Sequence, residues 1–195
     1  MANFSFCKLS LNDAYAITNF YHDDKRGSFI KSFEKDIYAS SGIMLSINET
    51  FVSVSQKNVL RGLHFQLRDP QAKLICLLSG SAWDVIVDLR KNSLTYKKWT
   101  SIELSSDGRN AVYVPRGFAH GFVSLADNTI MLYQCEGKYD KDTDTGILFN
   151  DKTIDIEWPI NAEDAILSDR DLKLMDFDSF EKKAEKYGFY KCYNR

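Results

Sequence analysis

Residues 81–89 read SAWDVIVDL, and their hydrophobicity repeats with a period of two. Successive side chains of a β-strand point to opposite faces, so one face would carry Trp83, Val85, Val87 and Leu89. The other face would carry Asp84, Ile86 and Asp88. The stretch therefore predicts a β-strand.

Short runs of the same kind recur along the chain, separated by turn signals such as LSGS, SSDGRN and ADN. They lie at residues 14–22, 50–55, 72–78, 110–115, 121–125 and 129–135. The chain has only 3 prolines, which suits a protein built mainly of paired strands. Many short strands predict a mainly β fold, either a barrel or a sandwich.

Helices are expected only at minor positions. The clearest would be C-terminal, with Asp178 as N-cap, Glu181 three residues later, and Phe180, Ala184 and Tyr187 on one face that packs outside the barrel. A second short helix is expected within residues 33–42 and would end at Gly42.

The composition is that of one globular domain. The chain has 195 residues, of which 44% are hydrophobic and 27% charged, with no repeat or Pro- or Gly-rich linker. We expect a single domain over residues 1–195 with a C-terminal helical tail at about 176–195. The net charge of −2 excludes an overall positive field that would hold nucleic acid. An anionic ligand would therefore need local arginines or lysines.

No stretch is long and apolar enough to cross a membrane, and the first residues lack the pattern of a signal peptide. These features predict a cytoplasmic protein without a membrane partner. The 4 cysteines are Cys7, Cys76, Cys135 and Cys192, and without a CxxC pair they are interpreted as free thiols.

The chain has 3 histidines, His22, His64 and His120, and the last two lie in distinctive sequences. Arg61 precedes His64 by three residues and could hold an anion beside the imidazole. An isolated histidine on a strand is more often structural than catalytic, and spacing alone leaves both interpretations open. Without an HxH pair or further convergent ligands, we expect no metal cofactor.

Seven segments taken together resemble the dTDP-4-dehydrorhamnose 3,5-epimerase family. They are VLRGLHFQ (59–66), Lys73 in AKL, GSAWDVIVDLRKNSLTYKKW (80–99), VPRGFAHGF (114–122), LY (132–133), FNDKTIDIEWP (149–159) and LSDRD (167–171). The resemblance implies a cupin-type double-stranded β-helix, or jelly-roll barrel, with a few short peripheral helices. It also implies a homodimer with exchanged N-terminal strands, which acts without a cofactor on a nucleotide-linked 4-keto-6-deoxy sugar in deoxysugar and surface polysaccharide biosynthesis.

The ketone at C4 of such a sugar acidifies the hydrogens at C3 and C5, so a base, an oxyanion stabiliser and an acid on the opposite face can invert either carbon. By resemblance, His64 is the base, Asp171 orients its imidazole, Lys73 stabilises the enolate and Tyr133 reprotonates the carbon. Arg26 and Arg61 match residues that bind the diphosphate. The other residues expected to bind substrate are Gln66, His120, Asp144 (or Thr145 beside it) and Arg170.

Three residues differ from the family pattern in the region that binds the nucleotide. Lys31 replaces a usual glutamate, and Glu49 and Phe51 replace the glutamine and asparagine of a QxNxSxS strand. A carboxylate only accepts hydrogen bonds, so Glu49 could pair with guanine or cytosine but poorly with thymine. The alternative is simple drift, with Glu49 pointing to solvent.

Other interpretations stay open. The chain could invert C3, C5 or both, because ring flipping in the pocket decides which carbon reaches the base. It could act on a GDP- or CDP-linked sugar, or it could shift a keto group between C3 and C4. It could also be a binding cupin without activity, although it retains both the base and the acid.

Overall fold

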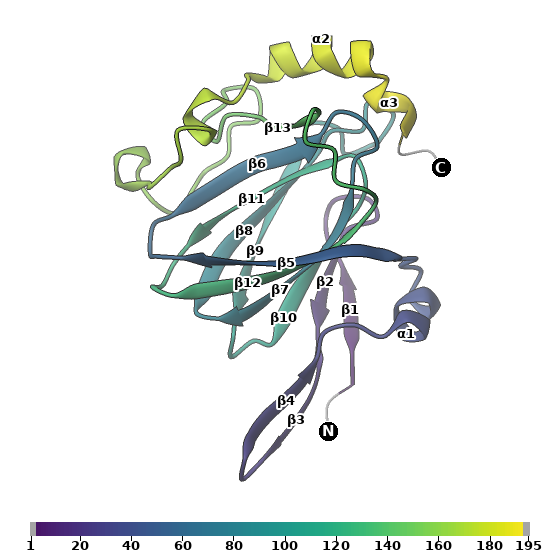
Figure 1. The fold of residues 1–195 in the computed structure, drawn as a ribbon, viewed down its shortest axis with the longest axis vertical. Coiled ribbons are helices and arrows are strands. Elements are labelled where there is room, and N and C mark those ends of the chain that lie inside the picture. Colours follow the sequence, from purple (N-terminus) through teal and green to yellow (C-terminus); the bar gives the residue numbers. More distant parts are fainter. Residues whose placement is uncertain (1–2, 193–195) are drawn as a thin grey trace.

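Two antiparallel sheets face each other and form the body of the protein (Figure 1). The computed structural model describes residues 3–192. One sheet has six strands in the order β1 (Ser5–Lys8), β2 (Tyr15–Thr18), β10 (Asn110–Val114), β7 (Ala72–Ser79), β12 (Thr129–Glu136) and β5 (Ile47–Ser55). The other has five, in the order β13 (Asp144–Gly146), β6 (Leu60–Gln66), β11 (Phe118–Ser124), β8 (Ser81–Asp88) and β9 (Trp99–Ser105). The predicted mainly β fold of cupin type is confirmed.

A two-stranded hairpin of β3 (Phe20–Asp24) and β4 (Gly27–Lys31) projects from the barrel (Figure 1). The predicted strand at 14–22 is therefore two strands, which is a correction. The break lies at Asn19, whose backbone N–H donates to the Arg109 carbonyl after β2 has paired with β10. From there the chain leaves the sheet and pairs with β4 instead.

The hydrophobic pattern does not reveal β1, β4, β6, β9 or β13. Strands β1, β9 and β13 lie at sheet edges, and β4 belongs to the projecting hairpin. Most side chains of these four strands are exposed or half-buried, whereas most of those of β6 are buried, so a strict apolar–polar alternation is absent.

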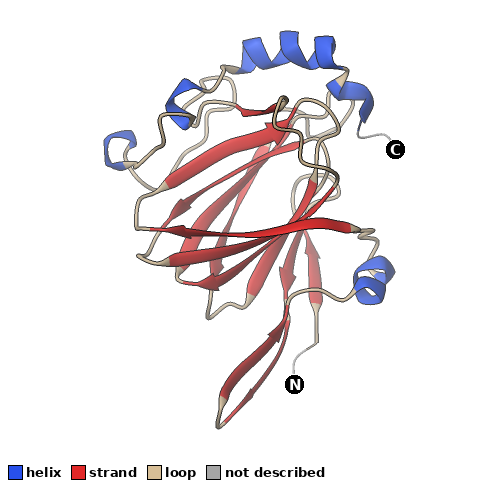
Figure 2. Ribbon diagram, in the orientation of Figure 1, coloured by secondary structure: helices blue, strands red, loops and turns tan. Residues whose placement is uncertain are grey.

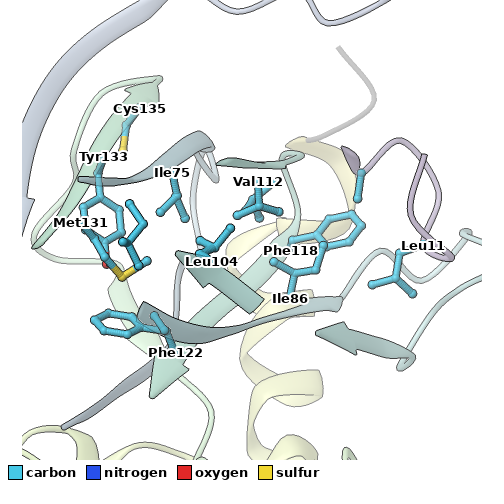
Figure 3. Packing of buried hydrophobic residues seen from close by; sticks show 14 residues of the cluster. Leu11, Ile75, Ile86, Leu104, Val112, Phe118, Phe122, Met131, Tyr133 and Cys135 are labelled. Atoms are coloured by element: carbon cyan, nitrogen blue, oxygen red, sulfur yellow. The ribbon is translucent and has the colours of Figure 1, made fainter. Parts of the chain in front are cut away.

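The core between the sheets shows where the strand at 81–89 points its two faces. Ile86 of β8 lies in the inner cluster of Figure 3, together with Ile75, Phe122 and Met131. The face with Asp84 and Asp88 therefore points into the barrel, and both residues are fully buried. The apolar face of the same strand points outward.

That outward face is covered by the C-terminal helix α2 (Phe177–Tyr187). Figure 2 shows the helices at the periphery: α1 (Lys35–Ser40), α2, α3 (Phe189–Cys192) and the 3-10 turns η1 (Ala162–Asp164) and η2 (Asp171–Lys173). Phe177, Phe180 and Ala184 of α2 are buried in one cluster with Val85 and Val87 of β8. The position of α2 outside the barrel and the short helix within residues 33–42 agree with the predictions.

Two details of the predicted α2 are wrong. The N-cap is Asp176, which keeps an extended backbone and accepts the Ser179 N–H at 2.8 Å, whereas Asp178 already lies in the first turn. Tyr187 is 39% exposed. Gly188 turns the chain with a φ of 69°, and the Phe189 ring then packs 5.4 Å from Phe180, in the place expected for Tyr187.

The helices within residues 3–192 are all too short or too polar to span a lipid bilayer. Cys7, Cys76 and Cys135 are free thiols, as predicted. The side chain of Cys192 lies outside the part of the chain that the structure describes.

Candidate active site

A pocket of about 200 Å³ lies between the two sheets at one end of the barrel. Its walls come from β5, β7 and β12 of the larger sheet and from β6 and β11 of the smaller one. Six residues predicted from the sequence line it: Phe51, Arg61, His64, Lys73, His120 and Tyr133. Ser53 and Phe122 complete the lining and are not among the predicted residues.

His64 and Asp171 form a close pair although 107 residues separate them in the chain. Nε2 of His64 lies 2.6 Å from Oδ1 of Asp171, whose side chain is only 5% exposed. Asp171 begins η2, and its backbone N–H donates to the Ser168 hydroxyl. A carboxylate at Nε2 leaves Nδ1 as the nitrogen that can take a proton.

The Asp171 carboxylate is held in its ionised form. Burial alone would raise its pKa, but the hydrogen bond and charge of His64, the Ser168 hydroxyl and the charge of Arg170 outweigh burial and lower it. An ionised carboxylate in contact with an imidazole stabilises the imidazolium that forms on proton abstraction. The pair can therefore act as a general base.

A second histidine–carboxylate pair lies deeper in the barrel. Nε2 of His120 is 2.7 Å from Oδ2 of Asp84, and both side chains are buried. Burial raises the pKa of Asp84, and His120 and Lys73 oppose that rise in part. Asp84 is a site residue that the sequence reasoning missed, although its position among apolar residues at 81–89 was a usable signal.

The backbones of β6 and β11 approach closely beside these histidines. A Cβ atom on Gly62 would lie 2.5 Å from the Gly121 Cα and 2.7 Å from the His120 carbonyl oxygen. The register pairs His64 directly with His120 across the two strands. Glycine at position 62 thus lets the strands bring both imidazoles to one pocket.

Lys73 enters the pocket from β7 on the opposite sheet. Burial lowers the pKa of its ammonium group, and the fields of Cys135, Asp144, Glu49 and Asp84 oppose that change. Lys73 is therefore not a solvated surface lysine. A cation whose hydration is reduced in this way interacts more strongly with negative charge that develops beside it than a fully solvated lysine would.

Tyr133 lies on β12 and is 6% exposed. Its ring stacks on that of Phe51 with centroids 4.7 Å apart and planes 11° apart. The His120 ring meets it edge-on at 6.0 Å. Burial raises the pKa of Tyr133, so the phenol keeps its proton at neutral pH and can donate it.

Arg61 spans the gap between the two sheets at the rim of the pocket. Its Nε donates to the Ser55 hydroxyl at 3.1 Å, and one terminal nitrogen donates to the Val54 carbonyl at 3.4 Å. The remaining donors of its guanidinium can bind an anion at the mouth of the pocket.

Four other predicted residues do not line the pocket. Gln66 donates to the carbonyls of Asp69 and Lys138 and so fixes the loop beyond β12. Asp144 pairs with Arg170 at 2.9 Å. Glu49 accepts a hydrogen bond from the Gln71 amide at 2.8 Å and is half-buried, so it does not simply point to solvent.

Two more predicted residues, Arg26 and Lys31, lie on the projecting hairpin of β3 and β4 and outside the pocket of their own chain (Figure 1). The Arg26 side chain is 81% exposed and pairs with Asp24 at 2.6 Å. Lys31 pairs with Glu34 at 2.7 Å.

Within residues 3–192, no group of three or more histidine, cysteine, aspartate or glutamate side chains is arranged to hold a metal ion. The pocket brings together a histidine from one sheet, and a lysine and a tyrosine from the other. Such a set can move protons at carbon next to a carbonyl.

Residues 8–179 match the family model described as dTDP-4-dehydrorhamnose 3,5-epimerase. An enzyme of that name from Methanothermobacter thermautotrophicus is 42% identical over 172 residues, which are 88% of this chain and 93% of that protein. A crystal structure of the enzyme of that name from Bacillus anthracis, with TDP and PPi bound, has a TM-score of 0.85 at 38% identity and covers 90% of this chain and 100% of its own.

A further crystal structure is that of a dTDP-6-deoxy-D-glucose-3,5-epimerase from Legionella pneumophila in complex with dTDP-4-keto-L-rhamnose. It has a TM-score of 0.89 at 31% identity and covers 93% of this chain and 97% of its own. The match with the family model includes every residue that lines the pocket, and also Asp171.

Proposed function

Because the chain belongs to the dTDP-4-dehydrorhamnose 3,5-epimerase family, we propose that it inverts C3 and C5 of a dTDP-linked 4-keto-6-deoxy sugar. It is then an isomerase of deoxysugar biosynthesis. The observation that carries the proposal is that His64, which contacts Asp171, and Tyr133 line one pocket from opposite sheets. A sugar ring between them would meet a base on one face and an acid on the other.

The reaction follows from that placement. His64 removes the proton from the carbon next to the C4 ketone, and the electron pair moves to the ketone oxygen as an enolate. Asp171 stabilises the imidazolium that results. Tyr133 then gives its phenolic proton to the same carbon from the other face, which inverts the configuration.

Lys73 is proposed to stabilise the enolate oxygen. Replacing Lys73 by Met keeps most of the side-chain volume and removes the charge, so we expect kcat to fall by about 10²- to 10³-fold. Steady-state kinetics with the keto sugar measure this change. Thermal unfolding serves as the control, because a variant with an unchanged or higher melting temperature has lost activity through the charge and not through the fold. A kcat within threefold of wild type would contradict the role.

We further propose a homodimer in which the hairpin of one protomer reaches the pocket of its partner. Strand β5 is a sheet edge, and several large apolar residues on β4, β5 and β7 are more than 40% exposed: Phe29, Ile30, Val52, Val54 and Leu78. An exposed edge and apolar residues of this kind favour pairing with a second copy. Arg26 would then bind the diphosphate of the partner's substrate.

A mixing experiment tests the exchanged hairpin. His64→Asn lacks the base and Arg26→Ala lacks the diphosphate contact, so each homodimer should be impaired at low substrate concentration. After unfolding and refolding together, the mixed dimer should hold one complete site, and about a quarter of wild-type activity should return. Activity equal to the average of the two separate variants would contradict the exchange, as would a monomer by light scattering.

Proton NMR in D2O tests the proposed function itself. The protein is given dTDP-4-keto-6-deoxyglucose, and loss of the C3 and C5 proton signals is followed together with the appearance of inverted product. Loss of both signals with inversion is expected. A product with the keto group at C3 would indicate a ketoisomerase. If neither the C3 nor the C5 proton exchanged, the proposal would be overturned and a binding protein would be favoured.

The same assay with GDP- and CDP-linked sugars tests the nucleobase. The Glu49 carboxylate favours a base with hydrogen-bond donors, but one of its oxygens is already occupied by Gln71, and the named relatives act on dTDP sugars. We therefore propose dTDP, for which kcat/KM should be the highest. A preference for GDP or CDP would show that Glu49 and Lys31 have changed the specificity.

A further inference from the structure

We infer that Phe51 is a positioning residue, which holds the ring of Tyr133 at the angle from which it protonates the substrate. The inference rests on the proposed function, because it takes Tyr133 as the acid. Phe51 stands where the family pattern has a small polar residue, so its role cannot be transferred from that pattern.

Phe51 and Tyr133 lie directly opposite each other on β5 and β12. Side chains at such positions share one face of the sheet and contact each other. The rings are nearly parallel, with an angle of 11° and a centroid distance of 4.7 Å, which is an offset stack. Phe51 itself is 46% exposed, whereas the Tyr133 ring beneath it is 6% exposed.

The hydroxyl end of Tyr133 is held only weakly. It lies 3.9 Å from the Met131 Sδ, and a thioether is a poor acceptor. The Ser53 hydroxyl is close enough to affect the phenol, yet its Oγ forms no hydrogen bond within residues 3–192 and so does not anchor it. The orientation of the phenol therefore depends on the packing of its ring.

Packing restrains that ring from two sides. Phe51 covers one face, and the His120 ring meets Tyr133 edge-on at 6.0 Å, where His120 is itself fixed by Asp84. Phe51 lies at the mouth of the pocket on the edge strand β5. Removing its ring opens a space on one side of Tyr133 into which the phenol can tilt.

A tilted Tyr133 affects only one of the two ways in which the enolate can regain a proton. After His64 has taken the proton, the enolate can regain a proton from the same face or receive one from Tyr133 on the other face. In D2O the first branch gives deuterium exchange without inversion, and the second gives inversion. Misplacing Tyr133 slows the second branch and leaves the first unchanged, so the ratio of inversion to exchange reports its position.

The test compares Phe51→Leu, which removes the ring, with Phe51→Tyr, which keeps it. For Phe51→Leu we expect the ratio of inversion to exchange to fall by about tenfold, since small misplacements of a reacting group have effects of this size. The rate of exchange should stay within about twofold of wild type. Phe51→Tyr should keep the wild-type ratio of inversion to exchange, because it preserves the ring stack on Tyr133.

Thr50→Ala is the matched control, because Thr50 is exposed on the other face of the same strand. It should leave both branches unchanged. If Phe51→Leu raised KM but kept the ratio of inversion to exchange, Phe51 would be only a wall of the binding site and the inference would be wrong. If the wild-type protein showed neither exchange nor inversion, the proposed function would fail first.

Discussion

His64→Asn should lower kcat by about 10³- to 10⁴-fold, which is the upper range for loss of a general base. His64 is the histidine in the pocket whose partner, Asp171, carries an ionised carboxylate at 2.6 Å. The asparagine amide is polar but cannot take a proton from carbon, and it is too short to replace Nε2 at the Asp171 carboxylate. Deuterium exchange at C3 and C5 should therefore disappear together with inversion, and proton NMR in D2O measures both.

The fold should survive this substitution, because the backbone of β6 stays paired with β11 and β13 whatever side chain stands at position 64. A melting temperature within a few degrees of wild type and an unchanged affinity for dTDP would confirm that only the base is lost. Exchange at the wild-type rate in His64→Asn would assign the base to another group, with His120 as the next candidate.

The alternation at residues 81–89 was sufficient to predict a strand. Together with the similar short runs elsewhere in the chain, it predicted a mainly β fold. It could not show which face of that strand points into the barrel. The apolar face with Val85 and Val87 suggests the interior, yet helix α2 covers it from outside, and the face with Asp84 lies within the barrel. A carboxylate belongs there only because β11 brings His120 to it, and local sequence contains no information about that neighbour.

The candidate site, too, could be predicted only in part. Resemblance was enough to select His64, Asp171, Lys73 and Tyr133, and the fold places the last two in one pocket with His64 while Asp171 contacts His64 from behind. The partners of Glu49 and Phe51 could not be predicted, since they depend on strand register. One residue of slip would turn Phe51 away from Tyr133, and the observed register is what creates the stacked pair.

Tyr133→Phe should separate the two halves of the reaction. The variant keeps the ring that stacks on Phe51 and loses the hydroxyl near Met131, so the pocket keeps its shape. Inversion should fall by about 10²- to 10³-fold, which is typical for loss of a general acid. Exchange should persist within a few-fold, because His64 and Lys73 still form the enolate. Starting sugar recovered from D2O should then carry deuterium with its original configuration.

Loss of exchange together with inversion would show that Tyr133 is needed to form the enolate as well as to protonate it. Inversion at the wild-type rate would assign the acid to water or to Lys73. The comparison with His64→Asn is what makes the experiment decisive, since that variant should lose exchange and inversion alike. A base and an acid that approach the sugar from opposite sheets of one barrel predict this asymmetry, whereas a base and an acid on the same face of the sugar would return each proton without inversion.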